Sequence, residues 1–459
     1  MTITRAGLAL PRVLTTLAAA SALAAGASVA RAQSLSEVID AARTYDATYL
    51  GVRSTTEAAM YRYEQQRALH LPSASLNAQV QRSVQNTPYI TDPSSSTTDT
   101  AGATINASQT LFNRQNDLAI DEAQRAVDVA RSQQLQAEQD LIVRVAQAYF
   151  NVLAATDALQ TVQGNKAAIG EQLASAKRNF EVGNATITDT REAEARSDLA
   201  RSQEIAAQND LQVAHVTLDQ LVGRNGVTPH ALALPATLPP VMPSQAQDWV
   251  NLAEADNPAL KQAQLNLEIA QLETSRAKAG NLPVVTAGAT LGKSYVHNAS
   301  TFQGGTGGIP TAYGGWGDSN SIGVTVSVPL FAGFAIQNRE RETVALENKA
   351  RTDVEGARNS ATLATRQTFL GAQSLAAQVK ALEAAQVSSK LALDATQLGY
   401  KVGVKVNLDV LNSQSQLYQT ERDLAKARYD YVVAMLRLRQ AAGTLTQNDI
   451  LAVNALLVP

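Results

Sequence analysis

Two short stretches of the chain, Phe180-Glu-Val-Gly-Asn-Ala-Thr-Ile-Thr-Asp189 and Tyr400-Lys-Val-Gly-Val-Lys-Val-Asn-Leu-Asp409, repeat one pattern. Each has an aromatic residue, then x-Val-Gly, then an aspartate, and each interrupts a long run rich in Ala, Gln and Leu. Gly183 and Gly403 can adopt the left-handed conformation that ends a helix. Both stretches therefore predict the tip of a helical hairpin.

The residues after each glycine indicate where the next helix begins. Thr186 or Thr188 in the first copy, and Asn407 in the second, carry side-chain oxygens that can cap a helix N-terminus. Asp189 and Asp409 can stabilise the positive end of the helix dipole there. We expect helices to restart at about residues 187 and 406.

The tips belong to an internal repeat. Leu71-Pro72 matches Leu282-Pro283, and Leu111-Phe112 matches Leu330-Phe331. We assign residues 33–227 to a first repeat, 228–248 to a Pro-rich connector, 249–445 to a second repeat and 446–459 to a C-terminal tail.

Each repeat is predicted to hold a helix, a strand pair, a very long helix, a tip and a second helix. In the first repeat these are residues 35–69, 73–85 with 101–111, 113–182, 183–186 and 187–222. In the second they are residues 249–279, 284–296 with 320–330, 333–402, 403–405 and 406–442. A helix of 70 residues is about 105 Å long, the length of two 35-residue helices end to end. These lengths, with the seven-residue step of Leu417, Leu424, Tyr431 and Leu438, predict long coiled-coil hairpins.

The four strand segments alternate between apolar and small polar residues with period two. Leu76 and Val80 share one face, for example, and Asn77 and Gln79 share the other. Each alternation covers about ten residues, the length of a tilted transmembrane strand. A half-exposed soluble sheet is the alternative. Because four strands cannot close a barrel and an open edge cannot face lipid, membrane strands here require several copies of the chain. Two copies supply 8 strands and three supply 12, and both numbers are permitted.

The first 32 residues resemble a signal peptide. Arg5 and Arg12 precede an apolar run, and Ala30-Arg31-Ala32 is an A-x-A cleavage site. We expect an exported chain. The absence of cysteine excludes disulfides, and the net charge of -3 argues against nucleic acid as a partner.

Catalytic motifs are missing from the sequence. The four histidines show no ligand spacing, and neither H-E-x-x-H nor a nucleophile elbow occurs. The Gly-rich run at 304–308 lacks the Lys-Ser/Thr of a phosphate loop. We therefore predict no enzyme, no cofactor and no metal site.

One long run carries a family resemblance. Tyr400-x-Val-Gly…Asp409-Val-Leu…Leu417-Tyr418…Ala427-Arg-Tyr429-x-Tyr431…Gly443-Thr-Leu445 is similar to the second-repeat signature of the TolC-type outer-membrane efflux proteins. The resemblance spans about residues 35–450. It implies an α+β membrane protein, in which a homotrimer shares a 12-strand β-barrel, four strands per chain, in the outer membrane. A long α-helical coiled-coil barrel continues it into the periplasm.

The resemblance also implies a function and partners. The chain would be the passive exit duct of a tripartite efflux or type I secretion system, joined by an inner-membrane pump and a periplasmic adaptor (membrane fusion) protein. Drugs, other small molecules, proteins and metals remain open as cargo. An exported coiled-coil structural or periplasmic adaptor protein is the alternative.

The resemblance places a gate at the hairpin tips. Its residues would be Thr188, Asp189, Tyr400, Lys405, Asp409 and Asn412. Lys405 stands where the family often has arginine, which makes bidentate contacts that lysine cannot. Asn412 stands where a second acidic ring can occur. We expect a gate that is held less firmly and binds cations more weakly than in relatives with both residues, although Asp189 and Asp409 can also serve as helix caps.

Overall fold

The computed structural model describes residues 32–87, 94–183, 186–233, 238–302 and 311–458. The predicted signal peptide, apart from Ala32, and the Gly-rich run at 304–308 lie outside these residues. The chain forms two compact units. One holds residues up to Leu50, Ala137–Asn257 and everything from Ala361 on, and the other holds Gly51–Gln136 and Pro258–Ser360. Each unit therefore combines corresponding parts of both repeats.

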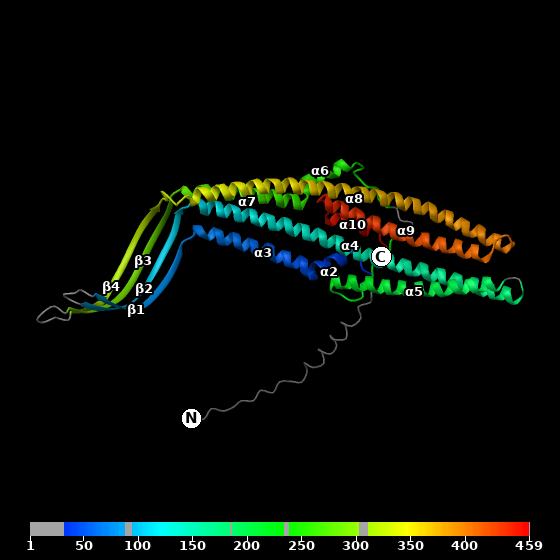
Figure 1. Cartoon of the computed structure of the whole chain (residues 1–459), viewed down its shortest axis with the longest axis horizontal. Coiled ribbons are helices and arrows are strands. Elements are labelled where there is room, and N and C mark those ends of the chain that lie inside the picture. Colours follow the sequence, from blue (N-terminus) through cyan, green and yellow to red (C-terminus); the bar gives the residue numbers. More distant parts are fainter. Residues whose placement is uncertain (1–31, 88–93, 184–185, 234–237, 303–310, 459) are drawn as a thin grey trace, which may run out of the picture. The chain divides into compact units, whose positions relative to one another are not determined.

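The second unit contains one four-stranded antiparallel sheet. Its strands β1 (Ser73–Thr87), β2 (Ser94–Phe112), β3 (Val284–Phe302) and β4 (Thr311–Ser327) lie side by side in sequence order (Figure 1). Strands β2 and β3 join the two repeats, with Ile105 opposite Leu291. Strands β1 and β4 each have one neighbour in this sheet, so they form its two edges.

The strands are longer than the alternation predicted. The segments left between the predicted strands, residues 86–100 and 297–319, are partly strand, because β2 already begins at Ser94 and β4 at Thr311; β4 ends at Ser327 and not at residue 330. Thr97, Thr98 and Thr100 are β-branched and support an extended backbone, while their polarity hides the period of two. The ladder thus continues where the hydrophobic pattern stops.

Two predicted helices are each broken in two, which corrects the assignments 35–69 and 249–279. The first consists of α2 (Leu35–Tyr45) and α3 (Ala47–Arg67), followed by the turn η1 (Ala68–His70). The second consists of α6 (Ala246–Asp256) and α7 (Pro258–Lys278), followed by η2 (Ala279–Asn281). Pro258 has no N–H to continue the helix bonding of α6.

Asp46 produces the first break through its side chain. Its Oδ1 accepts a hydrogen bond of 2.8 Å from the Tyr49 N–H and so caps α3. Arg144 lies 3.1 Å from its other oxygen. Burial raises the pKa of Asp46, but the hydrogen bonds from Arg144 and Tyr49 outweigh it and leave this pKa below its usual value. The charged carboxylate is therefore part of the helix junction.

The first unit holds the tip ends of two helical hairpins, from Ala137 and Ala361 on, together with the shorter helices α2, α6 and α10 (Gln447–Asn454). Helix α4 (Arg114–Glu181) turns back into α5 (Ile187–Val222), and α8 (Ala335–Lys401) turns back into α9 (Asn407–Ala441). Helix α10 follows and contacts α2. The α2, α4, α9 and α10 helices share the main core, which includes Ile39, Tyr149, Phe150, Leu436 and Ile450.

The signature residues of α9 have packing roles. Leu417, Leu424, Tyr431 and Leu438 are all buried, as the seven-residue step predicted. The Tyr429 hydroxyl donates a 2.7 Å hydrogen bond to Asp157 Oδ2 on α4. Burial raises the pKa of both Asp157 and Tyr429, so this contact is made inside the packed hairpins.

None of the described helices has an apolar stretch of the length needed to cross a bilayer.

Candidate functional site: the hairpin tips

Both tips turn at a glycine with positive φ. Gly183 has φ +76° and Gly403 has φ +79°, a conformation that other residues adopt at a cost. The Gly183 N–H donates to the Phe180 carbonyl at 3.0 Å, and the Gly403 N–H donates to the Tyr400 carbonyl at 3.1 Å. The aromatic residue of each motif thus supplies the acceptor that closes the turn.

The first tip ends in a capping box. The Asp189 N–H donates to Thr186 Oγ1 at 3.2 Å, and Asp189 Oδ2 accepts from the Thr186 N–H at 3.0 Å. The Thr186 hydroxyl adds a third hydrogen bond to the same carboxylate, at 2.8 Å. Thr188 lies exposed in the first turn of α5. The negative charge of Asp189 also meets the positive end of the α5 dipole.

The second tip differs, and the prediction that Asn407 caps α9 is wrong. The N-cap position is held by Val406, which makes no side-chain hydrogen bond. Asn407 is the first helical residue and is only 5% exposed. Within the described part of the chain, neither polar atom of its amide has a hydrogen-bond partner. The Val404 and Lys405 N–H groups both donate hydrogen bonds to the Gly399 carbonyl, so this turn is closed by backbone hydrogen bonds and not by a side-chain cap.

The predicted gate residues make three further contacts. The Tyr400 hydroxyl accepts a hydrogen bond of 3.3 Å from Asn179 Nδ2, which joins the end of α8 to the end of α4. Lys405 Nζ lies 3.5 Å from Asp409 Oδ2 within the second tip. Asn412 Oδ1 accepts from the Arg196 guanidinium at 3.0 Å, which joins α9 to α5.

Three of the six predicted residues line one cavity. Asp189, Tyr400 and Lys405 surround a volume of about 440 Å³ between the two tips. Its other lining residues are Ala176, Asn179, Lys401, Gly403, Val406 and Asn407. Thr188, Asp409 and Asn412 do not line it. The two tips of one chain therefore meet through a polar space with two lysines and one aspartate.

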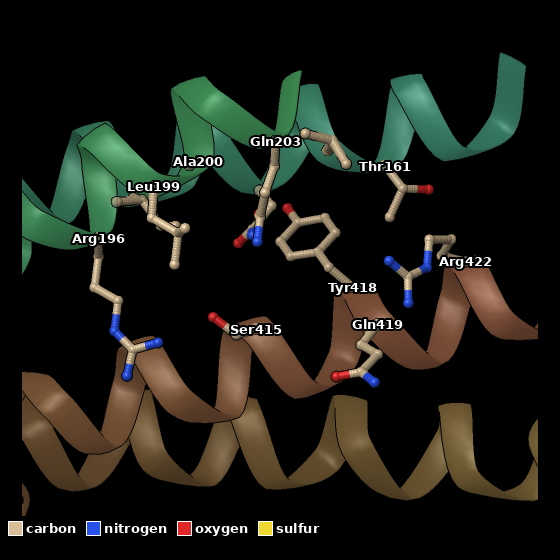
Figure 2. A pocket seen from close by; sticks show the side chains of 12 residues that line it. Thr161, Arg196, Leu199, Ala200, Gln203, Ser415, Tyr418, Gln419 and Arg422 are labelled. Atoms are coloured by element: carbon tan, nitrogen blue, oxygen red, sulfur yellow. The ribbon is translucent and has the colours of Figure 1, made fainter. Parts of the chain in front are cut away.

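A second cavity of about 320 Å³ lies further along the hairpins, between α4, α5 and α9. The ring of Tyr418, a signature residue, projects from α9 toward α5 in this cavity (Figure 2). A Cβ added to Gly164 would lie 3.3 Å from that ring, so the glycine gives it room. Arg196 and Arg422 also line the cavity and give it a basic character.

Asn179 and Arg196 were not found by sequence reasoning. Their partners Tyr400 and Asn412 lie more than 200 residues away in the chain. No local pattern encodes the relative register of two hairpins, so these contacts had no signal in a single sequence.

A sheet of four long strands, combined with very long helices that turn at glycine tips, defines a class of outer-membrane channel proteins. A family model described as "Outer membrane efflux protein" matches residues 50–224 and 249–444. The chain therefore belongs to the outer membrane efflux protein family.

Individual relatives agree with this assignment. The chain is 31% identical to "Outer membrane protein TolC" of Vibrio cholerae over 95% of this chain and 96% of that protein. It is 28% identical to "Outer membrane protein TolC" of Escherichia coli over 93% of this chain and 85% of that protein. The solved structure of the outer membrane protein VceC of Vibrio cholerae superposes with a TM-score of 0.73 at 20% identity, covering 89% of this chain and 96% of VceC. The predicted family, fold class and outer-membrane location are confirmed.

Proposed function

We propose that this chain is the outer-membrane exit duct of a tripartite efflux or type I secretion machine. Family membership and the TolC relatives support the channel, and 33% identity over 68% of the chain to "Alkaline protease secretion protein AprF" of Pseudomonas aeruginosa supports secretion. Substrate passes through without chemical change. The cargo is a drug, another small molecule or a protein.

The four-stranded sheet with two edges carries this proposal. One face exposes large aliphatic side chains, among them Leu76 at 70%, Val80 at 88% and Ile322 at 90%. Such a face suits lipid, but unpaired edge groups cannot be satisfied there. Pairing β4 of one copy with β1 of the next removes both edges, and three copies give 12 strands. The homotrimer is the arrangement that the family resemblance implies.

The remaining partners follow from the same assignment. An inner-membrane pump supplies the driving force, and a periplasmic adaptor joins the pump to the duct. The six tip residues, from Thr188 to Asn412 in chain order, form the periplasmic gate of this duct. The contacts that support this role are the Asn179–Tyr400 and Arg196–Asn412 hydrogen bonds, which tie the two hairpins of one chain together.

The test is electrophoresis of outer membranes without boiling. We expect an SDS-resistant species of three chains that boiling converts to the 48.6 kDa range of a single chain, less any leader. Recovery of the protein as a water-soluble monomer in the periplasmic fraction would contradict the proposal. The boiled sample is the internal control.

A further inference from the structure

The charged side chains of the described strands all lie on one face of the sheet. They are Arg82, Asp99, Lys293, His297 and Asp318. In each strand they alternate in step with the aliphatic residues, as Arg82 does between Val80 and Val84, and the register places them on the same side. The opposite face carries mostly Ser, Thr, Asn, Gln and Gly. In the described strands, the polar face therefore carries no charged residue, and all the charged residues lie on the face that also carries the aliphatic side chains. In a simple barrel pattern the charged residues would lie on the polar face.

Together with Tyr295 and Trp316, these five residues occupy three consecutive rows across the strands. We call these seven residues the belt. In the first row Lys293 Nζ lies 3.8 Å from Asp318 Oδ1. In the second row the rings of Tyr295 and Trp316 pack with their centroids 5.5 Å apart.

In the third row Arg82 makes two hydrogen bonds to Asp99, of 2.6 and 2.7 Å, and His297 stands opposite Asp99 in the register. The belt therefore combines cations, carboxylates and two large aromatic rings within about 14 Å along the strands.

From the belt toward the helices, the same face is mainly aliphatic. Ile322, Val324 and Val326 continue it along β4 and are all exposed. From Trp316 to Ser327 the strand rises by about 36 Å, which corresponds to about 26 Å of height at a tilt of about 45°. The apolar band of outer-membrane barrels is about 25 Å tall.

A second aromatic pair closes the other end of this band. Phe331 and Phe334, just past the end of β4, pack edge to face at 5.5 Å and are 74% and 63% exposed. Aromatic side chains gather at both membrane–water interfaces. The two aromatic pairs therefore lie at opposite ends of the aliphatic segment of β4.

We propose that the belt lies in the headgroup layer of the outer leaflet and that Arg82 and Lys293 contact the phosphates of lipid headgroups that carry a net negative charge. This inference rests on the proposed function, because it requires the sheet to be in a membrane. Charged side chains are costly at the bilayer midplane and tolerated near its surface. The side chains of Arg82 and Lys293 are 70% and 65% exposed, so both cations are available beyond their carboxylate partners. We place the belt at the outer surface of the membrane because it lies near the ends where β1 leads to β2 and β3 leads to β4. The long helices α4 and α8 follow the opposite ends of β2 and β4.

The chain's two tryptophans allow a direct depth measurement. Trp249 is 1% exposed, so lipid-borne quenchers affect only Trp316 in the wild type, and Trp249→Phe removes the background. The probe is the protein in vesicles of phosphatidylcholine with nitroxide labels at the headgroup, at a shallow or at a deep acyl position. We expect Trp316 to be quenched several-fold more strongly by the shallow labels than by the deep label. The wild type should give the same ranking if Trp249→Phe folds poorly.

Two matched variants distinguish the depth of the tryptophan in the bilayer from the face of the sheet on which it lies. Trp316→Phe with Ile322→Trp moves the probe into the aliphatic band and should be quenched best by the deep label. Trp316→Phe with Gly315→Trp moves it to the opposite face, where an added Cβ meets nothing within 4 Å, and should escape lipid quenching. Deep quenching of Trp316, or no quenching while Ile322→Trp is quenched, would overturn the belt assignment alone. If Ile322→Trp is also unquenched, the membrane location of the sheet fails with it.

The headgroup contact has its own test. Brominated phosphatidylglycerol in a phosphatidylcholine bilayer should quench Trp316 more than its bulk mole fraction predicts. Arg82→Gln with Lys293→Gln should reduce this quenching to the bulk value. Equal quenching in both proteins would contradict the phosphate contact.

Discussion

At the scale of single residues, Arg196 and Asn412 connect the two hairpins through a hydrogen bond from a charged guanidinium to an uncharged amide oxygen. The resemblance to the TolC-type efflux proteins implies that an acidic residue can stand at the position of Asn412. Asn412→Asp would supply the missing charge. We expect the resulting exposed pair to add about 0.5–1 kcal/mol per chain to the contact between α5 and α9. The proposed gate should then open less often, which would lower the conductance in planar bilayers.

The matched background is Arg196→Gln. There, Asn412→Asp leaves an unpaired carboxylate near the tips, which should raise cation selectivity and shift the reversal potential. With Arg196 present, the shift should be several-fold smaller because the charges compensate. An equal shift in both backgrounds would show that Arg196 does not pair with residue 412.

The same scale shows what a single sequence can and cannot predict. The glycine pattern locates both turns because positive φ is a property of one residue. The threonine cap was predictable for the same local reason. The burial of Asn407 was not, because it depends on how α8 and α9 pack around a cavity formed with α4.

At the scale of elements, α9 carries polar residues in its buried seam. Asn407 and Gln414 are seven residues apart and only 5% and 3% exposed, and they share the buried face of α9 with Val410 and Leu417. Within the described residues, both amide atoms of Asn407 and Nε2 of Gln414 have no partner. Each unsatisfied buried group costs about 1–3 kcal/mol. The unpaired amides therefore make the seam less stable near the tip than an apolar seam of the same size would be.

Asn407→Leu should stabilise this seam by about 1–2 kcal/mol, because it replaces unpaired polar atoms with apolar ones of similar size. We expect a thermal midpoint of helix unfolding a few degrees higher, measured by circular dichroism, together with slower export through the duct. Gln416→Leu, at an exposed position of the same helix, is the control and should leave the midpoint unchanged. A lower midpoint for Asn407→Leu would mean that the amide is satisfied in the assembled protein.

Element boundaries also show where hydrophobic patterns mislead. The breaks at Asp46 and Asn257 fall inside segments that were predicted as continuous helices, although one depends on a side-chain cap and the other on Pro258. Strand length was underestimated because pairing with a neighbour extends β2 and β4 into segments rich in Ser, Thr and Gly. The hydrophobic pattern of a sequence reflects which residues are buried, whereas the ends of β2 and β4 are determined by backbone hydrogen bonds to the neighbouring strands.

At the scale of the whole molecule, the two edges of the sheet determine how copies of the chain can assemble. Four strands with an aliphatic face are unsuited to lipid as an open sheet, and the chain itself offers no further strand among its described residues. The edges of neighbouring copies must therefore meet. The need for several copies was predictable from the number of strand segments. The strand order β1-β2-β3-β4, which makes β1 of the first repeat and β4 of the second repeat the two edges, is known only from the structure.

The most direct measurement is disulfide cross-linking between β1 and β4. The chain has no cysteine, so one pair of cysteines can be introduced at a time. Each pair combines a substitution in β1 (Leu76→Cys, Val80→Cys or Val84→Cys) with one in β4 (Ile322→Cys or Val324→Cys). Neighbouring strands bring paired residues to about 4.5–5.5 Å between Cα atoms, within disulfide range. Val80→Cys with Ala101→Cys, which face each other within one chain, is the control and should cross-link without joining chains. We predict that at least one β1–β4 pair oxidises in outer membranes to a covalent trimer; a series that ends at dimers, or that joins no chains at all, would contradict the account.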